Sequence, residues 1–239
     1  MRRARPLPAT ALYGLIFARM GKGAAQPLPP VLHETPAYVH LWSGLEVRGR
    51  LGDVAENFLD ATHTITVHPG MLRGTDSASP AKVVVAGRAG QVEVTYRGEG
   101  RPAGIIARMF EGTRSSTVGR FRGPNIADVE FHGPAGIRIA ITSYLTPTQA
   151  GKVGGFAIIT APGNPWLGRL KFAALKPFAT LLNRQDMRIL NLVDDNHALF
   201  GRPPRASAPT DYVAFEIEAV LSGDRSAMSE TSRVLDAYL

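Results

Sequence analysis

The sequence predicts an α+β protein in which an antiparallel sheet and long helices occupy separate parts of the chain. Between residues 82 and 161, apolar β-branched segments alternate with glycine-rich turns, which is the pattern of antiparallel hairpins. After Pro165 the apolar residues follow a helical period instead. A block of strands followed by helices indicates helices segregated from the sheet. The 239 residues, 44% hydrophobic and 20% charged, suffice for a sizeable core and argue against long disorder.

The first 36 residues are predicted to form an arm that precedes one folded domain, residues 37–239. Leu12–Ala18 is apolar and predicts a buried strand, whereas Pro27–Pro36 predicts a linker. A signal or transit peptide is the alternative for this region, because the apolar segment Ala9–Met20 follows three arginines.

One helix and a series of strands are predicted for the middle of the chain. Ala37–Leu51 is predicted to be extended, and Asp53–Thr62 to be a helix that Asp53 caps. Glycine-rich turns then join two pairs of strands into hairpins, and another apolar run follows them. These strands are Lys82–Ala86 with Gln91–Tyr96, Asn125–Phe131 with Ile137–Leu145, and finally Val153–Ala161.

The remaining residues are predicted to be mainly helical. Pro177 suits the first turn of a helix, and the apolar pattern continues over Phe178–Phe200 until Gly201 stops it. Thr210–Leu221 and Ala227–Leu239 are predicted as two further helices. These helices complete the α+β pattern.

The charge of the chain is concentrated near its N-terminus. Lysine and arginine number 27 against 20 acidic residues, which gives a net charge of +7 and a pI near 10.0. Residues 1–33 supply five of these cations and no acid, so the other 206 residues carry only +2. That remainder has no basic footprint for a polyanion, so no nucleic-acid partner is expected.

The absence of cysteine and of long apolar runs excludes several classes of protein. With no cysteine, this chain cannot form disulfides, thiolate zinc sites, a cysteine nucleophile or an iron–sulfur cluster of its own. No apolar run reaches the roughly 18–20 residues that span a bilayer. We therefore expect no membrane partner and a cytoplasmic location.

The densest group of chemically capable residues lies between 57 and 68. Asn57, Asp60 and His63 follow a helical spacing, and His68 comes five residues after His63. Five residues correspond to about 140° around a helix, so the two histidines meet at one metal only if the helix ends between them. The β-branched residues 64–67 favour such an end. The alternative is two unrelated histidines and a capping aspartate.

A third ligand is offered by Asp186, which lies among apolar residues such as Leu182 and Leu190 at helical spacing. A carboxylate on a buried face is costly unless it is paired or binds a metal. Two histidines and one carboxylate with open positions suit Fe(II). The alternatives are a salt bridge from Asp186 to Arg184 or Arg188, and a zinc or iron hydrolase, for which no general base is evident.

These segments resemble a known family, the Rieske-type non-haem iron oxygenases. Glu56–Gly70 resembles the iron-binding signature Asn-x-x-Asp-x-x-His-x-x-x-x-His. Gln185–Leu190, with Asn196, Phe200–Gly201 and Pro209–Asp211, resembles the C-terminal helix that delivers the carboxylate ligand. The order and spacing are similar to single-subunit-type members that act on aromatic acids and ethers.

The resemblance implies roles for five residues. It implies that His63, His68 and Asp186 bind Fe(II). It also implies that Asp60 accepts a hydrogen bond from His63 and links the iron site to the Rieske cluster of a neighbouring subunit. Asn57 would lie beside the iron.

The resemblance further implies a helix-grip (START-like) fold for the domain, with an antiparallel sheet and a long C-terminal helix. Tyr13–Gly21 is similar to the last strand of a Rieske domain, so the arm would hold a remnant strand. The pocket is expected to be lined by Ile137–Leu145 and Val153–Ile159, with Arg138 or His132 as an anchor for a substrate carboxylate.

The family also carries a Rieske domain, whose cluster needs cysteines that this chain lacks. The expected function is therefore an oxygenase component that activates O2 at Fe(II) and hydroxylates or demethylates an aromatic or similar apolar substrate. Its 2Fe–2S cluster would belong to a separate Rieske ferredoxin-type donor, served by a reductase, and a homotrimer is compatible with this arrangement. The alternatives are a truncated gene product and a START-like module that binds an apolar ligand without redox activity.

Overall fold

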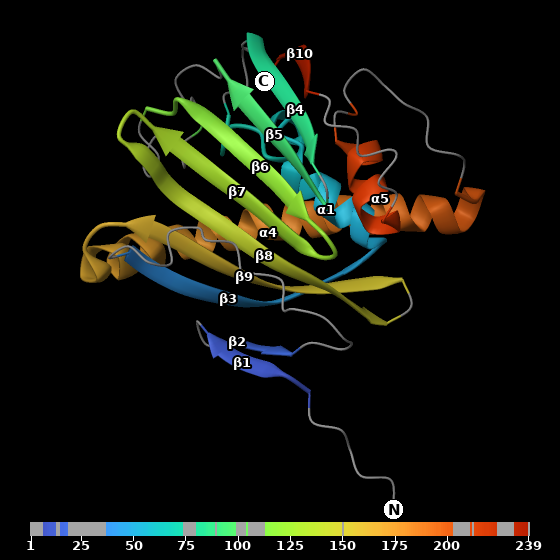
Figure 1. The fold of residues 1–239 in the computed structure, drawn as a ribbon, viewed down its shortest axis with the longest axis horizontal. Coiled ribbons are helices and arrows are strands. Elements are labelled where there is room, and N and C mark those ends of the chain that lie inside the picture. The colour runs from blue at the N-terminus through green and yellow to red at the C-terminus, as the bar shows by residue number, and fades with distance from the viewer. Residues whose placement is uncertain are drawn as a thin grey trace, which may run out of the picture.

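An eight-stranded antiparallel sheet with helices against one face forms the centre of the computed structural model (Figure 1). The strand order in this sheet is β10-β4-β5-β6-β7-β8-β9-β3, and β1 and β2 form a separate hairpin. The structure describes residues 7–12, 15–18, 37–73, 80–88, 90–98, 104, 113–149, 151–202, 211, 213–223 and 232–238. The strands are β1 Ala9–Leu12, β2 Leu15–Ala18, β3 Ala37–Arg48, β4 Pro80–Arg88, β5 Gln91–Arg97, β6 Ser116–Arg122, β7 Ile126–Gly133, β8 Gly136–Gln149, β9 Lys152–Pro162 and β10 Ser232–Tyr238.

The predicted α+β arrangement and both predicted hairpins are confirmed. Strand β4 pairs with β5 and β7 pairs with β8, each in antiparallel register, and β9 and β3 continue the sheet beyond β8. Strand β6, which was not predicted, joins the two hairpins by pairing with β5 on one side and β7 on the other. A continuous sheet results, and it forms one wall of the core.

Four helices lie among the described residues: α1 Leu51–Leu59, α2 His63–Val67, α4 Pro165–Phe200 and α5 Ala214–Ser222. The core lies between the sheet and these helices, where Val92 and Val94 of β5 meet Leu59 of α1 and Ile217 of α5. Helix α4 runs along β3 and the sheet (Figure 1). No helix in the described ranges is long and apolar enough to cross a membrane.

The helix α4 begins at Pro165, so the predicted start at Pro177 is wrong. The Asn164 side chain caps the helix by accepting hydrogen bonds from the backbone N–H groups of Trp166 and Leu167, at 2.9 and 3.4 Å. Pro165 occupies the first turn, where its missing N–H costs nothing. Pro177 lies inside the helix, and the capping residue thirteen positions earlier, Asn164, fixes the start.

The N-terminal end of α1 also differs from the prediction. Helix α1 begins at Leu51, with Arg50 at the capping position and no side-chain cap. Asp53 lies in the first turn instead, and its carboxylate accepts a hydrogen bond from Arg202 at 3.1 Å. The acid near the helix N-terminus is therefore stabilised by the helix dipole and by an ion pair, not by capping.

The segment predicted as a helix over Ala227–Leu239 contains strand β10, Ser232–Tyr238, so that prediction is wrong for its described part. This strand pairs antiparallel with β4, and Ala237 of the strand is buried. Helical propensity is a weak preference, and the open hydrogen-bonding edge of β4 outweighs it here.

The predicted single buried strand Leu12–Ala18 is instead a hairpin of β1 and β2, and Ile16 is exposed. The Phe17 ring packs edge-on against Tyr144 with centroids 5.0 Å apart. Tyr144 and its neighbours Ile126 and Ile158 lie on the sheet face away from the helices, where this hairpin packs. Tyr13, Gly14 and the predicted linker Pro27–Pro36 lie outside the described residues.

Candidate metal centre and pocket

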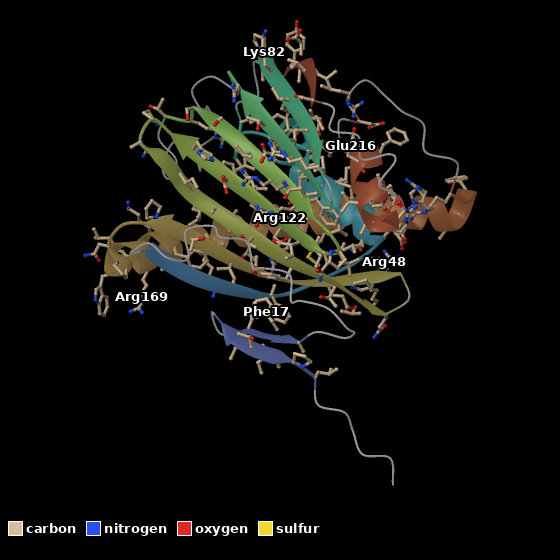
Figure 2. All side chains as sticks on the ribbon, in the orientation of Figure 1. Phe17, Arg48, Lys82, Arg122, Arg169 and Glu216 are labelled. Atoms are coloured by element: carbon tan, nitrogen blue, oxygen red, sulfur yellow. The ribbon has the colours of Figure 1, made fainter. Side chains whose placement is uncertain are left out.

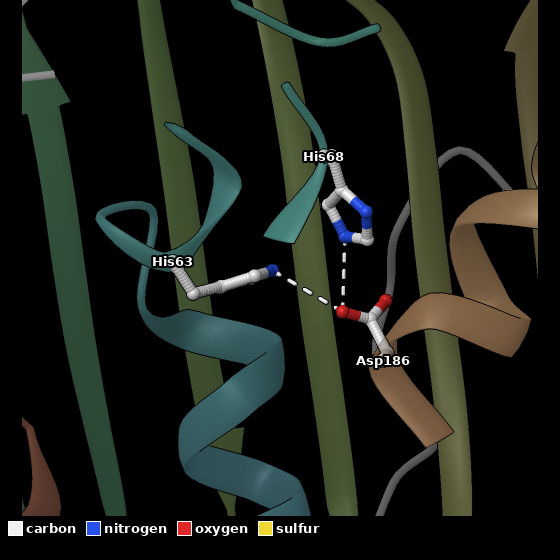
Figure 3. A group of neighbouring side chains, drawn as sticks. All are labelled: His63, His68 and Asp186. Carbon is white, nitrogen blue, oxygen red and sulfur yellow. Dashed lines mark ion pairs between the residues drawn. The ribbon is translucent and has the colours of Figure 1, made fainter. Parts of the chain in front are cut away.

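Three side chains from two separate parts of the chain meet above the sheet: His63 and His68 at the ends of α2, and Asp186 in the middle of α4 (Figure 3). The Nε2 atoms of His68 and His63 lie 2.9 and 3.5 Å from Oδ1 of Asp186. One ligand atom from each residue lies within 4.8 Å of the others, a group that could hold a metal ion.

The helix end that brings the two histidines together comes earlier in the chain than predicted. Helix α1 ends at Leu59, and residues 60–62 turn the chain before α2 begins at His63. The helix was predicted to end between His63 and His68, whereas it ends before His63, which is the first residue of the second helix. His68 follows directly after the last residue of α2, so the two rings approach with centroids 5.4 Å apart.

Hydrogen bonds on the far side of each ring fix its orientation. Nδ1 of His63 donates to the backbone carbonyl of Asp60 at 2.5 Å, and Nδ1 of His68 donates to Oε1 of Gln185 at 2.8 Å. Because a carbonyl oxygen can only accept, each Nδ1 carries a hydrogen. In the neutral imidazole the lone pair is therefore on Nε2, the atom that would bind a metal, and protonation of Nε2 gives the ion pair with Asp186 when no metal is bound. Such outer partners are typical of histidines that bind metals.

The electrostatics of this group suit a cation. His68 is only 2% exposed, and Oδ1 of Asp186 is buried without a hydrogen-bond donor of suitable geometry among the described residues, although His68 Nε2 is within ion-pair distance. Burial lowers the pKa of His68, but the Asp186 carboxylate and the Gln185 amide together raise that pKa above its ordinary value. Two imidazole nitrogens and a carboxylate oxygen around one point match the ligands of a divalent iron or zinc ion.

The alternative salt bridges of Asp186 do not form within the described part of the chain. Its ion pairs are with the two histidines, and neither Arg184 nor Arg188 pairs with it. Asp195, one of the acids farther along α4, pairs with Arg48 instead, at 2.5 Å.

Asp60 and Asn57 both line the pocket beside these ligands, but the expected contact of Asp60 differs. Its carboxylate accepts hydrogen bonds from the Thr62 backbone N–H at 2.7 Å and from the Thr62 hydroxyl at 2.7 and 2.8 Å. The predicted hydrogen bond with His63 is made by the backbone carbonyl of Asp60, not by its carboxylate. The side chain therefore closes the turn between α1 and α2.

A cavity of about 190 Å³ adjoins the three ligands. Of the two segments predicted to line it, Ile137–Leu145 contributes Ile141, and Val153–Ile159 contributes nothing. Neither Arg138 nor His132 lines the cavity. Nε2 of His132 lies 3.0 Å from Oε2 of Glu130 instead. The walls of the cavity come from α1, α2 and α4 and from strands β5 to β8. The other lining residues are Asn57, Phe58, Leu59, Asp60, Ala61, His63, Thr64, His68, Leu72, Arg73, Tyr96, Arg114, Thr117, Gly119, Val129, Phe131, Leu182 and Asp186.

The polar groups of this cavity were not predicted. Arg114 lies with its guanidinium 4.8 Å from the centroid of the Phe131 ring, and Nε of Arg73 donates to the Thr64 hydroxyl at 2.7 Å. The Thr117 hydroxyl is buried at the wall without a hydrogen-bond partner among the described residues. Alternation along the strands could have placed Thr117 and Phe131 on the inner face. For Thr117 the signal was lost because β6 was not predicted, whereas Phe131 lies in the predicted strand Asn125–Phe131.

Tyr96 supports the ligand segment from below, which sequence reasoning also missed. Its buried hydroxyl donates to the Leu59 carbonyl at 2.8 Å and accepts from the Ala61 backbone N–H at 3.2 Å. These two bonds hold the chain where α1 ends and the turn toward His63 begins.

We expect Tyr96→Phe to lower the free energy of unfolding by about 1–3 kcal/mol, because it leaves buried backbone groups unpaired. Urea unfolding would measure the change. The matched control is Tyr238→Phe, which alters an exposed ring and should change little. Equal urea midpoints for the two variants would contradict the support assigned to Tyr96.

Comparison with known families identifies the chain. Residues 47–223 match the vanillate O-demethylase oxygenase C-terminal domain, so the chain belongs to this family of Rieske oxygenase catalytic domains. The resemblance drawn from the motif around His63 is thereby confirmed at the level of the family. No curated protein matches the chain.

Solved structures of Rieske oxygenases share the fold. NdmA of Pseudomonas putida CBB5 with caffeine is 16% identical with a TM-score of 0.70, covering 98% of this chain and 67% of that one. Dicamba monooxygenase bound to dicamba is 16% identical with a TM-score of 0.69, covering 92% and 70%. An oxygenase–ferredoxin complex of carbazole 1,9a-dioxygenase, bound to fluorene, is 15% identical with a TM-score of 0.62, covering 94% and 67%. The chain thus spans about two thirds of these proteins.

Proposed function

We propose that this chain is an oxygenase component that holds Fe(II) with His63, His68 and Asp186 and hydroxylates or demethylates an aromatic or similar apolar substrate. One observation carries the proposal: two imidazole nitrogens and a carboxylate oxygen converge on one point beside an apolar cavity. When bound, iron with two histidines and one carboxylate supplies O2 chemistry and keeps open positions for it. Membership in a family of oxygenase catalytic domains supports this choice over other metals.

The chain's own residues would orient the ligands and exclude water. Gln185 and the Asp60 carbonyl keep both Nε2 atoms aimed inward, and Asp186 supplies negative charge. Apolar side chains such as Val129 and Ile141 line the cavity beside them. An apolar cavity of about 150 Å³ admits benzene, so a cavity of about 190 Å³ favours a substrate with one substituted ring.

The electrons would come from outside this chain. A Rieske cluster needs two cysteines, and the sequence contains none. We propose a separate Rieske ferredoxin-type protein as donor, with a reductase behind it. The solved complex of a carbazole 1,9a-dioxygenase oxygenase with its ferredoxin offers a precedent in a protein of the same fold.

Metal content with oxidation state, measured on the protein made with iron, tests the proposal directly. We expect about one Fe(II) per chain. Zinc in its place would favour a hydrolase. An empty site would favour the second candidate, a module that binds an apolar ligand without redox activity, which the lack of cysteine makes worth testing.

Asp60 is proposed to link the iron site to the electron donor. The substitution Asp60→Asn keeps an acceptor for Thr62 and leaves the carbonyl that contacts His63, so we expect a folded protein that retains iron. We expect donor-driven turnover to fall about 10–100-fold, the range typical of residues that support a metal site, because the substitution removes the carboxylate charge from the turn that carries His63. Product formation per iron would measure it.

The control for Asp60→Asn is Asp195→Asn, which changes an exposed carboxylate paired with Arg48. It should leave turnover unchanged. If Asp60→Asn unfolds several degrees lower yet turns over normally with the donor, Asp60 has only a structural role.

A further inference from the structure

The first part of α4, residues 165–185, has an apolar stripe that faces away from the protein. Trp166 and Leu170 are 75% and 70% exposed, and Leu167, Phe178 and Leu181 are exposed as well. At about 100° per residue, these five side chains fall within a sector of roughly 120°. Exposed large apolar side chains in one contiguous stripe mark an interaction surface.

The opposite side of α4 packs against the rest of the protein. Phe172 is buried there, and Leu182 and Asp186 on that side line the cavity. Because these residues lie about half a turn away from Trp166, the outer stripe is not an extension of the core. The segment is therefore apolar on two faces, of which the protein covers one.

Positive charge flanks the stripe. Arg169, Lys171, Lys176 and Arg184 lie in residues 165–185, which contain no acid. By helical position Arg169 and Lys176 lie along one edge of the stripe, and Lys171 lies along the other. The guanidinium of Arg169 is 5.3 Å from the centroid of the Trp166 ring, at the end of α4 farthest from α5 (Figure 2).

This charge is local. Apart from residues 1–33 and 165–185, the chain has a net charge of −2. The other pair of highly exposed apolar residues on α4, Leu199 and Phe200, lies near the acids Asp194 and Asp195. Only the first part of α4 combines an exposed aromatic stripe with cations on both sides, among the helices that the structure describes.

We propose that this stripe, Trp166, Leu167, Leu170, Phe178 and Leu181 with its flanking cations, docks the protein on an anionic lipid bilayer. An apolar helix face that contains Trp and Leu, with Lys and Arg beside it, is typical of helices that lie in the plane of the membrane interface. Basic residues near an anionic bilayer each add about 1 kcal/mol, which is roughly a five-fold increase in binding.

Other occupants fit less well. A second copy related by a two-fold axis would bring like charges together around the stripe. An acidic protein would satisfy the cations but would have to offer an equally long apolar groove between its acids. The stripe on α4 would lie on the membrane surface and would not span the bilayer. It departs from our expectation of no membrane partner, which rested on the lack of a spanning segment, and it holds whether or not the chain binds iron.

Vesicle co-sedimentation of the full chain tests this proposal. We expect binding at least about ten-fold stronger to phosphatidylcholine vesicles with about 30% phosphatidylglycerol than to phosphatidylcholine alone. Salt should weaken this difference because it screens surface charge. The chain contains two tryptophans, so Trp42→Phe leaves Trp166 as reporter, and its emission should shift to the blue with anionic vesicles.

Paired substitutions distinguish binding through this stripe from nonspecific binding by any exposed apolar residues. Trp166→Ser with Leu170→Ser, and separately Arg169→Glu with Lys176→Glu, should each reduce binding at least about ten-fold. The matched control, Leu199→Ser with Phe200→Ser, removes an equally exposed apolar pair and should not. Circular dichroism would check that all variants are folded.

Three results would overturn the proposal. One is no binding to anionic vesicles at low salt. Another is equal loss of binding in the Leu199/Phe200 control. The third is an oligomer in sedimentation without lipid that the Trp166/Leu170 variant abolishes, which would assign the stripe to a second copy of the chain.

Discussion

His63→Ala and Asp186→Ala are each expected to reduce bound iron from about one per chain to less than a tenth. Each variant removes one of three converging ligand atoms, and the weaker site should lose its iron to water during gel filtration. Elemental analysis after gel filtration would measure this. The matched control is His197→Ala, on the same helix but eleven residues beyond Asp186, about 16 Å along the axis.

Full iron occupancy in either variant would remove that residue from the ligand set. The pH dependence offers a second check, because the pKa of His68 is raised in the metal-free protein. A raised pKa means that protonated His68 stabilises the metal-free fold at low pH, and this contribution is lost as pH rises through the folded pKa. Iron competes with that proton for His68, so the increase in melting temperature caused by iron should grow as pH rises. This pH dependence is opposite in sign to that of the stabilisation by protonated His68.

The candidate site could be predicted from the sequence because its residues lie in a local pattern. The two histidines, five residues apart, can converge only across a break in the helix, and the β-branched residues between them favour such a break. The break actually falls at residues 60–62, and the β-branched residues form the short helix α2. Local spacing thus indicated convergence, while the turn that achieves it depends on Asp60 and Thr62.

The parts that could not be predicted depend on contacts between distant segments. Asp186 was predicted to join the two histidines, but the support from its neighbour was not: Gln185 reaches His68 across 117 residues of sequence. Strand β10 is defined by the edge of β4, and Ser232–Tyr238 carries no local signal that would outweigh its helical pattern. The cavity walls likewise required β6, whose pairing with two hairpins is a property of the whole sheet.

The isolated chain, loaded with iron, is expected to show less than about 1% of the turnover that it shows with a Rieske protein. With no cysteine it cannot hold an iron–sulfur cluster, so nothing in these 239 residues stores an electron beside the metal. Oxygen uptake coupled to product would be followed with NADH and a flavin reductase, first alone and then with a separate Rieske ferredoxin-type protein.

Two controls make that experiment decisive. Asp186→Ala with the full donor system should give no product, which assigns turnover to the iron site and not to the donor. Chemically reduced Rieske protein, supplied without reductase, should support product in proportion to the electrons it delivers. Repeated turnover by the isolated chain with only NADH and the reductase would show that the chain does not depend on a cluster protein, and the split arrangement of oxygenase and donor would be wrong.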